Sequence, residues 1–445
     1  MILSLNIQRV KLLNNMENKM EKIISLTKRR GFIYPGSEIY GGLAGAWDYG
    51  PLGILLKNNI KNYWWNRFVL KRDDIYGIDA AILMNAKVWE ASGHASGFSD
   101  SLVECKKCHH RFRSDHIKDK CPDCGGNLTE EKQFNMMFKT IIGPVEETGA
   151  QIYLRPETAQ GIFVNFKNII DTFHPKLPFG VAQIGKAFRN EITPKDFVFR
   201  VREFEQMEIE YFIKPPKKNE WEKDFDYWLK QIHEFLEEIG LNKKNIYDRE
   251  VLGKDLSHYS KKTIDIDYNF PFKKDEIVGF AYRTDFDLKA HGLDYYDEET
   301  KERFIPHVIE PSFGVDRLIF ALLCEVFEED EMGGEKRIFL KFKPNMAPIK
   351  VAVFPLLKNK PDLVKKSREV YEMIKKEIQP VMFDDNGNIG KRYRRQDEIG
   401  TPYCVTIDFE TLDNNTVTIR DRDTGQQERV KILELTNFLK NAILE

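Results

Sequence analysis

Four cysteines within one short window constrain the fold of this chain more than any other feature. They follow the pattern Cys-x2-Cys, twelve residues, Cys-x2-Cys, at Cys105, Cys108, Cys121 and Cys124. Paired knuckles of this kind bring four thiolates tetrahedrally around Zn²⁺. Because four cysteines close the coordination shell, we expect a structural zinc ribbon and not a catalytic metal centre.

Other interpretations of the cysteine window stay open. The cysteines could form two reduced, unliganded pairs or two disulfides, and three histidines between the pairs are alternative ligands: His109, His110 and His116. A zinc ribbon also does not separate RNA binding from simple bracing of an insertion. The chain's other two cysteines are isolated, which is unlike a disulfide-rich secreted domain, so we expect a reducing, cytoplasmic setting.

Length and charge narrow the function classes. The 445 residues suggest roughly three domains. The formal net charge is −2, so a site for a polyanion must be a local patch. No apolar stretch approaches the roughly 20 residues that cross a bilayer. The N-terminus lacks an apolar core region and a small-residue cleavage site, so we reject a signal peptide and interpret residues 1–15 as a tail, either disordered or an over-long start.

Hydrophobic periodicity predicts the main elements. Helical spacing covers residues 17–34 and 56–70, an amphipathic helix is expected within 217–240, and an apolar helix within 315–327. Alternating, strand-like segments run through residues 134–211 and recur at 263–268 and 277–282. From residue 345 the pattern becomes a buried strand, a helix, a basic loop, a strand, a hairpin and a last helix, which predicts a separate domain of about 100 residues with a mixed sheet.

The segment FRNEITPKDFVFRVREFEQMEIEY, residues 188–211, carries an ordered set of charges. Period-2 alternation places Arg200, Arg202, Phe204, Gln206 and Glu208 on one strand face. That face runs from cations through an aromatic ring and an amide to an acid, which indicates a nucleotide joined to an amine-bearing group. The alternative is a solvated hairpin with cross-strand ion pairs. The next acid along the face, Glu210, is interpreted as a solvated strand residue.

Several segments in order carry a resemblance to a known family. FRNE (188–191), FGVDR (313–317) and IDAAILMNAKVWEASGH (78–94) look like the three signature motifs of the class II aminoacyl-tRNA synthetases. WDYGPLG (47–53), RPETAQG (155–161), REFEQMEIEYF (202–212), RTDFDL (283–288), EPSFG (310–314) and GKRYRRQDEIGTPYC (390–404) are more specific. From about Glu17 to its end, the chain closely resembles the homodimeric glycyl-tRNA synthetases within that class.

The resemblance implies a fold and a reaction. The fold is α+β: an antiparallel six- or seven-stranded sheet flanked by helices over residues 16–345, with a zinc-ribbon insertion at about 101–130 and a helical insertion at about 215–262. An α/β anticodon-binding domain then covers 346–445. The implied enzyme is a homodimer that activates glycine with ATP and Mg²⁺ and passes glycine to the 3′ end of tRNA(Gly).

The resemblance also implies site residues. Arg189 and Arg317 would be catalytic, holding the α- and γ-phosphates, Phe204 would stack on adenine, and Glu276 would carry Mg²⁺. The implied ATP-binding set is Arg189, Asn190, Glu191, Phe199, Arg200, Arg202, Glu203, Phe204, Glu276, Ile277, Gly314, Asp316 and Arg317. The implied glycine-binding set is Arg113, Glu157, Phe204, Glu205, Gln206, Glu208, Glu310, Ser312 and Gly314. The implied tRNA-binding set is Lys391, Arg392, Tyr393, Arg394 and Arg395, with a solvated loop as the alternative.

Three questions remain at the sequence level. Alternation puts Glu205 on the opposite face from Gln206 and Glu208, so a structural ion pair is its alternative role. Arg155 would either belong to the site or brace it. The competing function classes are a non-catalytic synthetase relative, which would typically lose the motif arginines, and another class II specificity, against which RPETAQG and EPSFG argue. No editing domain is expected, because no smaller amino acid competes with glycine.

Overall fold

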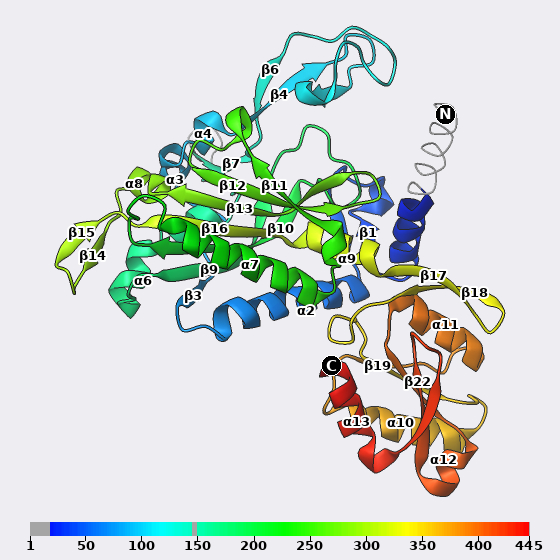
Figure 1. The fold of residues 1–445 in the computed structure, drawn as a ribbon. Coiled ribbons are helices and arrows are strands. Elements are labelled where there is room, and N and C mark those ends of the chain that lie inside the picture. Colours follow the sequence, from blue (N-terminus) through cyan, green and yellow to red (C-terminus); the bar gives the residue numbers. More distant parts are fainter. Residues whose placement is uncertain (1–17, 145–148, 445) are drawn as a thin grey trace, which may run out of the picture.

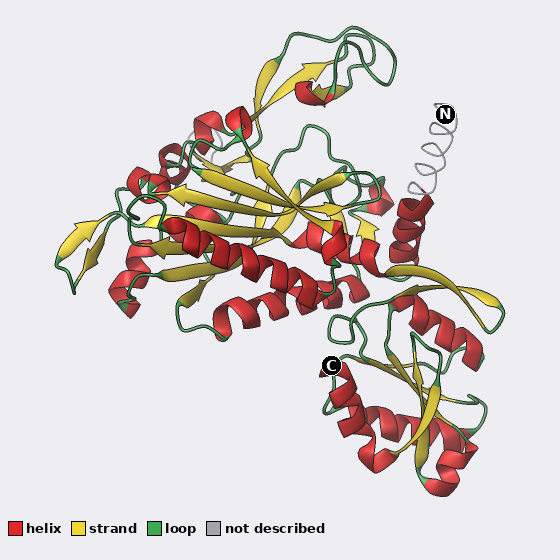
Figure 2. Ribbon diagram, viewed as in Figure 1, coloured by secondary structure: helices red, strands yellow, loops and turns green. Residues whose placement is uncertain are grey.

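The computed structural model describes residues 18–144 and 149–444. Figures 1 and 2 show a large unit of sheet and helices, a small insertion that projects from it, and a C-terminal unit of helices and strands. A helix over residues 18–29 opens the described part of the chain. The tail expected over residues 1–15 lies outside the described residues.

A seven-stranded sheet forms the centre of the large unit. Neighbouring strands are antiparallel except β3, which runs parallel to β9 at one edge. The expected antiparallel sheet of six or seven strands is therefore confirmed, with one parallel edge strand added. In spatial order the strands are β11 (Ile246–Val251), β12 (Lys262–Asn269), β13 (Lys274–Thr284), β16 (His307–Gly314), β10 (Glu203–Ile213), β9 (Phe179–Phe188) and β3 (Ile75–Ile78).

Two long helices, α2 (Pro51–Trp65) and α7 (Trp221–Ile239), lie along one face of this sheet (Figure 1). Their apolar side chains recur every three or four residues, as Leu56, Ile60 and Trp64 do on α2, and these are fully buried. Helix α9 (Val315–Val326) follows β16 directly and is apolar nearly all round, so it sits in the core. The sequence therefore predicts these three helices correctly.

Shorter elements complete the large unit. The helical ones are η1 (Glu38–Tyr40), η2 (Asn66–Leu70), α3 (Ala86–Ala91), α4 (His94–Gly97), η3 (Ser114–His116), α5 (Ala159–Phe163), α6 (Phe166–Phe173), η4 (Lys243–Asn245), η5 (Gly253–Asp255) and α8 (Phe286–Ala290). The paired strands are β1 (Ile33–Pro35) with β2 (Trp47–Tyr49), β7 (Lys139–Ile142) with β8 (Ala150–Tyr153), β14 (Tyr295–Asp297) with β15 (Glu302–Phe304), and β17 (Phe327–Met332) with β18 (Glu335–Leu340). None of the helices in the described ranges has the length and apolar character needed to cross a membrane.

The projecting insertion carries the four clustered cysteines. Its sheet has the order β5 (Arg111–Arg113), β4 (Ser99–Glu104), β6 (Lys132–Asn135). Cys105 and Cys108 follow β4 in a tight turn, and Cys121 and Cys124 lie in a second turn. The two turns bring the four thiols together at one end of the insertion.

The C-terminal unit contains a five-stranded mixed sheet, as predicted. Strands β20 (Val381–Phe383), β19 (Val351–Pro355) and β21 (Tyr403–Ile407) are parallel, whereas β22 (Thr416–Asp421) and β23 (Gln427–Lys431) continue antiparallel. Four helices pack around this sheet: α10 (Pro361–Lys375), α11 (Ile389–Ile399), α12 (Phe409–Asn414) and α13 (Ile432–Leu444).

The basic loop expected at residues 390–395 is wrong, because these residues form helix α11. Asn388 caps the helix, since its side chain accepts a hydrogen bond from the Lys391 backbone N–H at 2.9 Å. Gly400 ends it in the left-handed conformation with φ of 80°. The cap residue and the terminal glycine are ordinary helix signals that the density of charge concealed.

Buried charges join the hairpin β17–β18 to the C-terminal unit. Arg337 of β18 is 1% exposed and pairs with Asp330 at 2.5 Å. It also lies 3.4 Å from Asp397 of α11 and donates to the Arg422 carbonyl at 2.6 Å. Asp397 in turn pairs with Arg420 at 2.8 Å. Helix α11 is thus tied to the large unit through paired, buried side chains.

Candidate active site

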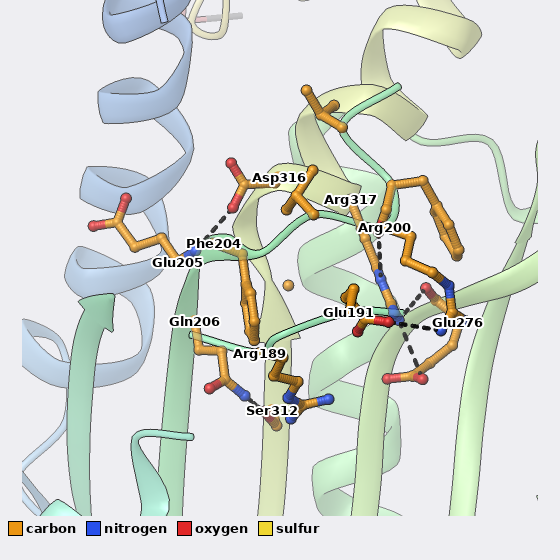
Figure 3. A pocket seen from close by; sticks show the side chains of 14 residues that line it. Arg189, Glu191, Arg200, Phe204, Glu205, Gln206, Glu276, Ser312, Asp316 and Arg317 are labelled. Atoms are coloured by element: carbon orange, nitrogen blue, oxygen red, sulfur yellow. Dashed lines mark hydrogen bonds and ion pairs between the residues drawn. The ribbon is translucent and has the colours of Figure 1, made fainter. Parts of the chain in front are cut away.

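Two adjoining cavities open over β10, β13 and β16, and Figure 3 shows the first of them. The first has a volume of about 610 Å³. Arg189, Gln206, Glu276 and Ser312 line both cavities, so the two form one continuous site. The first is lined by Arg189, Glu191, Val198, Phe199, Arg200, Val201, Phe204, Glu205, Gln206, Glu276, Ser312, Gly314, Asp316 and Arg317.

Strand β10 presents Phe204, Gln206 and Glu208 to this site, two residues apart. Phe204 and Gln206 line the first cavity, whereas Gln206 and Glu208 line the second. The Gln206 amide donates to the Ser312 hydroxyl at 3.2 Å (Figure 3). The order of ring, amide and acid along the strand is therefore the order in which the side chains meet the cavities.

The cationic end of the site lies beside aromatic rings. The Arg189 guanidinium is 5.2 Å from the Phe204 ring centre and donates to the Pro156 carbonyl at 3.1 Å. Arg317, at the start of α9, lies 4.5 Å from the Phe199 ring centre and 3.2 Å from the Glu276 carboxylate. Such placement fixes guanidinium groups while leaving them directed into the cavity.

The acidic end of the site is formed by three buried carboxylates from different elements. Glu157 lies 3.3 Å from His94 Nε2, and Glu310 accepts from Arg283 Nη1 at 2.8 Å. Burial acts to raise the pKa of Glu157, but His94 and Arg283 lower it well below its usual range. For Glu208, burial and the neighbouring Glu157 raise the pKa. Three carboxylates with different charged neighbours thus surround one small volume.

Two residues of this end carry no assignment in the sequence prediction. Arg283 is 1% exposed and binds both Glu310 and Asp287, and it begins the quoted segment RTDFDL. His94 ends the quoted segment 78–94, and its Nδ1 lies 2.8 Å from the Ser92 hydroxyl. For Arg283, the sequence signal for a role in the site was a basic residue inside a motif rich in acids. For His94, the sequence offered no signal beyond its place in the motif.

Two predicted glycine ligands, Glu205 and Arg113, pair with other residues away from the acidic end of the site. Glu205 pairs with Lys57 at 3.0 Å and with Lys61 at 2.9 Å, both from α2. Figure 3 shows its side chain directed away from that of Gln206. Arg113, on β5 of the insertion, pairs with Asp100 at 2.8 Å and lines neither cavity. The structure therefore does not bring these two side chains together with the buried acids.

Four members of the predicted ATP set also have side chains outside the cavity lining: Asn190, Arg202, Glu203 and Ile277. Arg202 donates to the Ala44 carbonyl at 2.7 Å, which braces the loop between β9 and β10. Glu203 pairs with Lys186 at 2.7 Å, and Ile277 is 1% exposed in the core. Arg155 likewise braces the sheet, since it donates to the Ala80 carbonyl at 2.7 Å.

The interpretation of Glu210 as a solvated strand residue is wrong. Its side chain is 0% exposed, because helices α5 and α8 contact β10, β13 and each other over this face of the sheet. Alternation predicted the face of the strand correctly, but not that helices cover it.

Comparison with known proteins identifies the family. The model of the tRNA synthetase class II core domain (G, H, P, S and T) matches residues 138–326, and that of the anticodon binding domain matches residues 350–442. The glycine–tRNA ligase of Clostridium kluyveri is 51% identical over 465 aligned positions, covering 96% of this chain and 99% of that protein. The chain belongs to the glycine–tRNA ligase family.

Other members of the glycine–tRNA ligase family are similarly close. The Clostridium acetobutylicum protein is 50% identical, with 96% of this chain and 99% of that protein covered. The Ruminiclostridium cellulolyticum protein is 50% identical over 96% and 98% of the two chains. The class II core match over residues 138–326 includes both Glu157, at the acidic end of the site, and Arg317, at its cationic end. Both ends of the site therefore lie within the family's core domain.

The cysteine window forms a compact cluster in the structure. The four Sγ atoms lie within 4.8 Å of one another, and Cys105 Sγ is 3.4 Å from Cys124 Sγ. These cysteines are free, and the separation exceeds the roughly 2 Å of a disulfide bond. A Cβ added at Gly126 would lie 2.9 Å from Cys105 Sγ, so the turn leaves room only for glycine. The backbone N–H groups of Lys107 and Cys108 donate to Cys105 Sγ at 3.4 and 3.5 Å, and four converging thiols supported in this way fit a metal ion.

The predicted tRNA-binding residues divide between two sides of α11. Lys391 and Arg394 line a surface cavity together with Glu335 of β18. Arg392 is 1% exposed and donates to the Gly387 carbonyl at 2.7 Å. Tyr393 also lines that cavity, and its hydroxyl lies 2.6 Å from that of Thr406. Arg394 pairs with Glu335 at 3.2 Å, and Arg395 pairs with Asp384 at 2.7 Å.

Proposed function

We propose that this glycine–tRNA ligase activates glycine with ATP and transfers it to the 3′ end of tRNA(Gly) in the site over β10. One observation carries the proposal: the site grades from Arg189 and Arg317, past Phe204, to the buried acids Glu157, Glu208 and Glu310. A phosphate chain, an adenine ring and an ammonium group require cationic, aromatic and acidic partners in one continuous site.

In the first step a glycine carboxylate oxygen attacks the α-phosphorus of ATP, and pyrophosphate leaves. The nucleophile is already ionised, so the enzyme must supply charge neutralisation and alignment and needs no base. Arg189 and Arg317 would hold the α- and γ-phosphates, and Phe204 would stack on adenine. Glu276, half-exposed between both cavities, would hold Mg²⁺, which neutralises phosphate charge when bound.

In the second step a hydroxyl oxygen of the terminal tRNA ribose attacks the glycyl carbonyl carbon, and AMP leaves. The acidic end keeps the glycine ammonium in place through both steps. The lowered pKa of Glu157 supports its role, because the carboxyl remains ionised at neutral pH. Specificity requires only that side chains larger than hydrogen be excluded.

The zinc, dimer and location proposals rest on separate observations. The cysteine cluster would hold a structural Zn²⁺ that folds the insertion. Leu83, within the first signature segment, and Ile142, on β7, are each 52% exposed, which supports a homodimer interface there. The free state of all six cysteines supports a cytoplasmic setting.

We retain domain limits of 16–345 for catalysis and 346–445 for anticodon binding, with Lys391 and Arg394 as the accessible tRNA contacts.

ATP–pyrophosphate exchange across a panel of amino acids tests the proposed function. We expect exchange with glycine and none with alanine or serine. Exchange with serine or alanine instead would indicate another class II specificity. Absence of exchange with every amino acid would indicate a non-catalytic relative.

A further inference from the structure

Glu210 lies directly behind the acidic end of the site and lines neither cavity. It follows Gln206 and Glu208 on the same face of β10. The register on either side of it pairs Glu208 with Ser312 and Tyr211 with Ile309, so Glu210 lies opposite Glu310 of β16. Carboxylate oxygens of Glu208, Glu210 and Glu310 lie within 4.8 Å of one another. Like charges opposite each other across strands repel.

The three acids differ in what supports their charge. Glu310 accepts from Arg283 at 2.8 Å, and Glu208 accepts from the Thr158 hydroxyl. Both oxygens of Glu210 are buried without any hydrogen-bond partner among the described residues. An ionised carboxylate in that state would be strongly destabilised, whereas a protonated one needs only a nearby acceptor.

The charged groups around Glu210 come from every element packed against it. Glu310 on β16 and Glu208 on β10 oppose its ionisation, as does Asp287 on α8, and Arg283 on β13 favours it. The guanidinium of Arg283 already binds Asp287 at 2.7 Å and Glu310 at 2.8 Å. Burial is the largest influence, and together with Glu310 it raises the pKa of Glu210 well above its usual range.

We propose that Glu210 is a neutral carboxylic acid whose O–H donates to Glu310 from behind the site and so positions that carboxylate for the glycine ammonium. The pair then carries one negative charge and one proton. Glu310 stays an acceptor toward the cavity, and its second oxygen is held by Arg283. Glu210 is a positioning residue for glycine and has no contact with ATP. This role rests on the proposed function of the site.

Two variants of similar volume separate a hydrogen-bond donor from simple filling. E210Q keeps a neutral donor, so we expect its glycine KM to stay within about threefold of wild type. E210M fills the space without a donor, and we expect glycine KM to rise about tenfold with ATP KM unchanged, the usual scale for a lost bond to a charged group. Equal KM values for E210Q and E210M would overturn the proposal, as would an equal rise in glycine and ATP KM.

Infrared spectroscopy tests the protonation state of Glu210 independently of any activity assay. At pH 7 the wild-type-minus-E210Q difference spectrum should show a protonated-carboxyl C=O band. No such band would overturn the neutral state of Glu210. A wild-type protein that shows the band but no glycine-dependent exchange would overturn the proposed function instead.

Discussion

The ammonium of Lys57 on α2 lies 3.0 Å from the carboxylate of Glu205 on β10, with only 4% of the lysine side chain exposed. Lys61 approaches the same carboxylate at 2.9 Å. These contacts fasten the helix to the strand that carries Phe204 and Gln206 on its other face. Glu205 therefore stabilises the platform of the site from below.

E205Q should destabilise the protein at pH 7 by about 2 kcal/mol, the scale for hydrogen bonds to charged groups. Burial acts to raise the pKa of Glu205, but Lys57 and Lys61 lower it overall. The stabilisation is then present above the unfolded-state pKa, about 4.3, and is lost as the pH falls through the lower folded value. Urea unfolding at pH 7 and at pH 3 should show the difference shrinking at the lower pH.

E203Q is the matched control for that experiment. Glu203 lies on the same strand as Glu205 and pairs with Lys186 at the protein surface, where the Glu203 side chain is 52% exposed. Exposed pairs contribute at most about 1 kcal/mol. A loss of stability in E203Q equal to that in E205Q would contradict the proposed anchoring by α2.

Replacing either motif arginine should abolish activation with little effect on folding. R189A and R317A remove charges that act on the phosphates, and we expect each to lower ATP–pyrophosphate exchange by about 100-fold or more. The control is R303A, since Arg303 lies on the β14–β15 hairpin and pairs with exposed Asp294. Exchange by R189A within a few-fold of R303A would argue against the assigned role.

C121S should lower bound zinc from about one equivalent to less than half, because a structural site needs all four ligands. The insertion should then become sensitive to proteolysis, which mass spectrometry of the fragments would locate. H109A is the control: His109 is exposed and pairs with Glu104 at 3.0 Å, so zinc should stay bound. Loss of zinc from H109A as well would show that a histidine takes part in coordination.

The double variant K391A/R394A should raise the KM for tRNA several-fold and leave glycine activation unchanged. Contacts of this kind depend on salt, so the difference from wild type should shrink as ionic strength rises. R392A should behave differently, because Arg392 is buried and holds backbone carbonyls; its main effect should be a lower melting temperature. Equal loss of aminoacylation and activation in K391A/R394A would contradict tRNA binding at this face.

Local pattern predicted the sheet, the long helices and the order of side chains along β10. Alternation is a backbone property, so it correctly placed Phe204, Gln206 and Glu208 on one face. It did not extend to Arg202, because β10 begins only at Glu203 and the preceding residues form an irregular loop.

Burial and partners lie outside what such patterns contain. The acidic Glu210 is buried because helices α5 and α8 cover its face of the sheet, which is a property of the tertiary arrangement. Likewise Arg392 carries the same charge as Lys391 but is buried, because the 11-residue helix turns it toward the domain interior. The contacts of Arg283 depend on three separate elements and could not be read from one segment.

The buried joint between Asp397 and Arg337 ties helix α11 firmly to the β17–β18 hairpin. Lys391 and Arg394 lie along the side of the helix that lines the surface cavity, where Arg394 pairs with Glu335 of the hairpin at 3.2 Å. Asp397 lies at the buried joint itself. The hairpin that α11 rests on continues without a break from α9, whose first turn holds Arg317. A displacement of the basic side chains would therefore be transmitted through the hairpin to the segment that leads to the phosphate end of the site, because no flexible linker separates them.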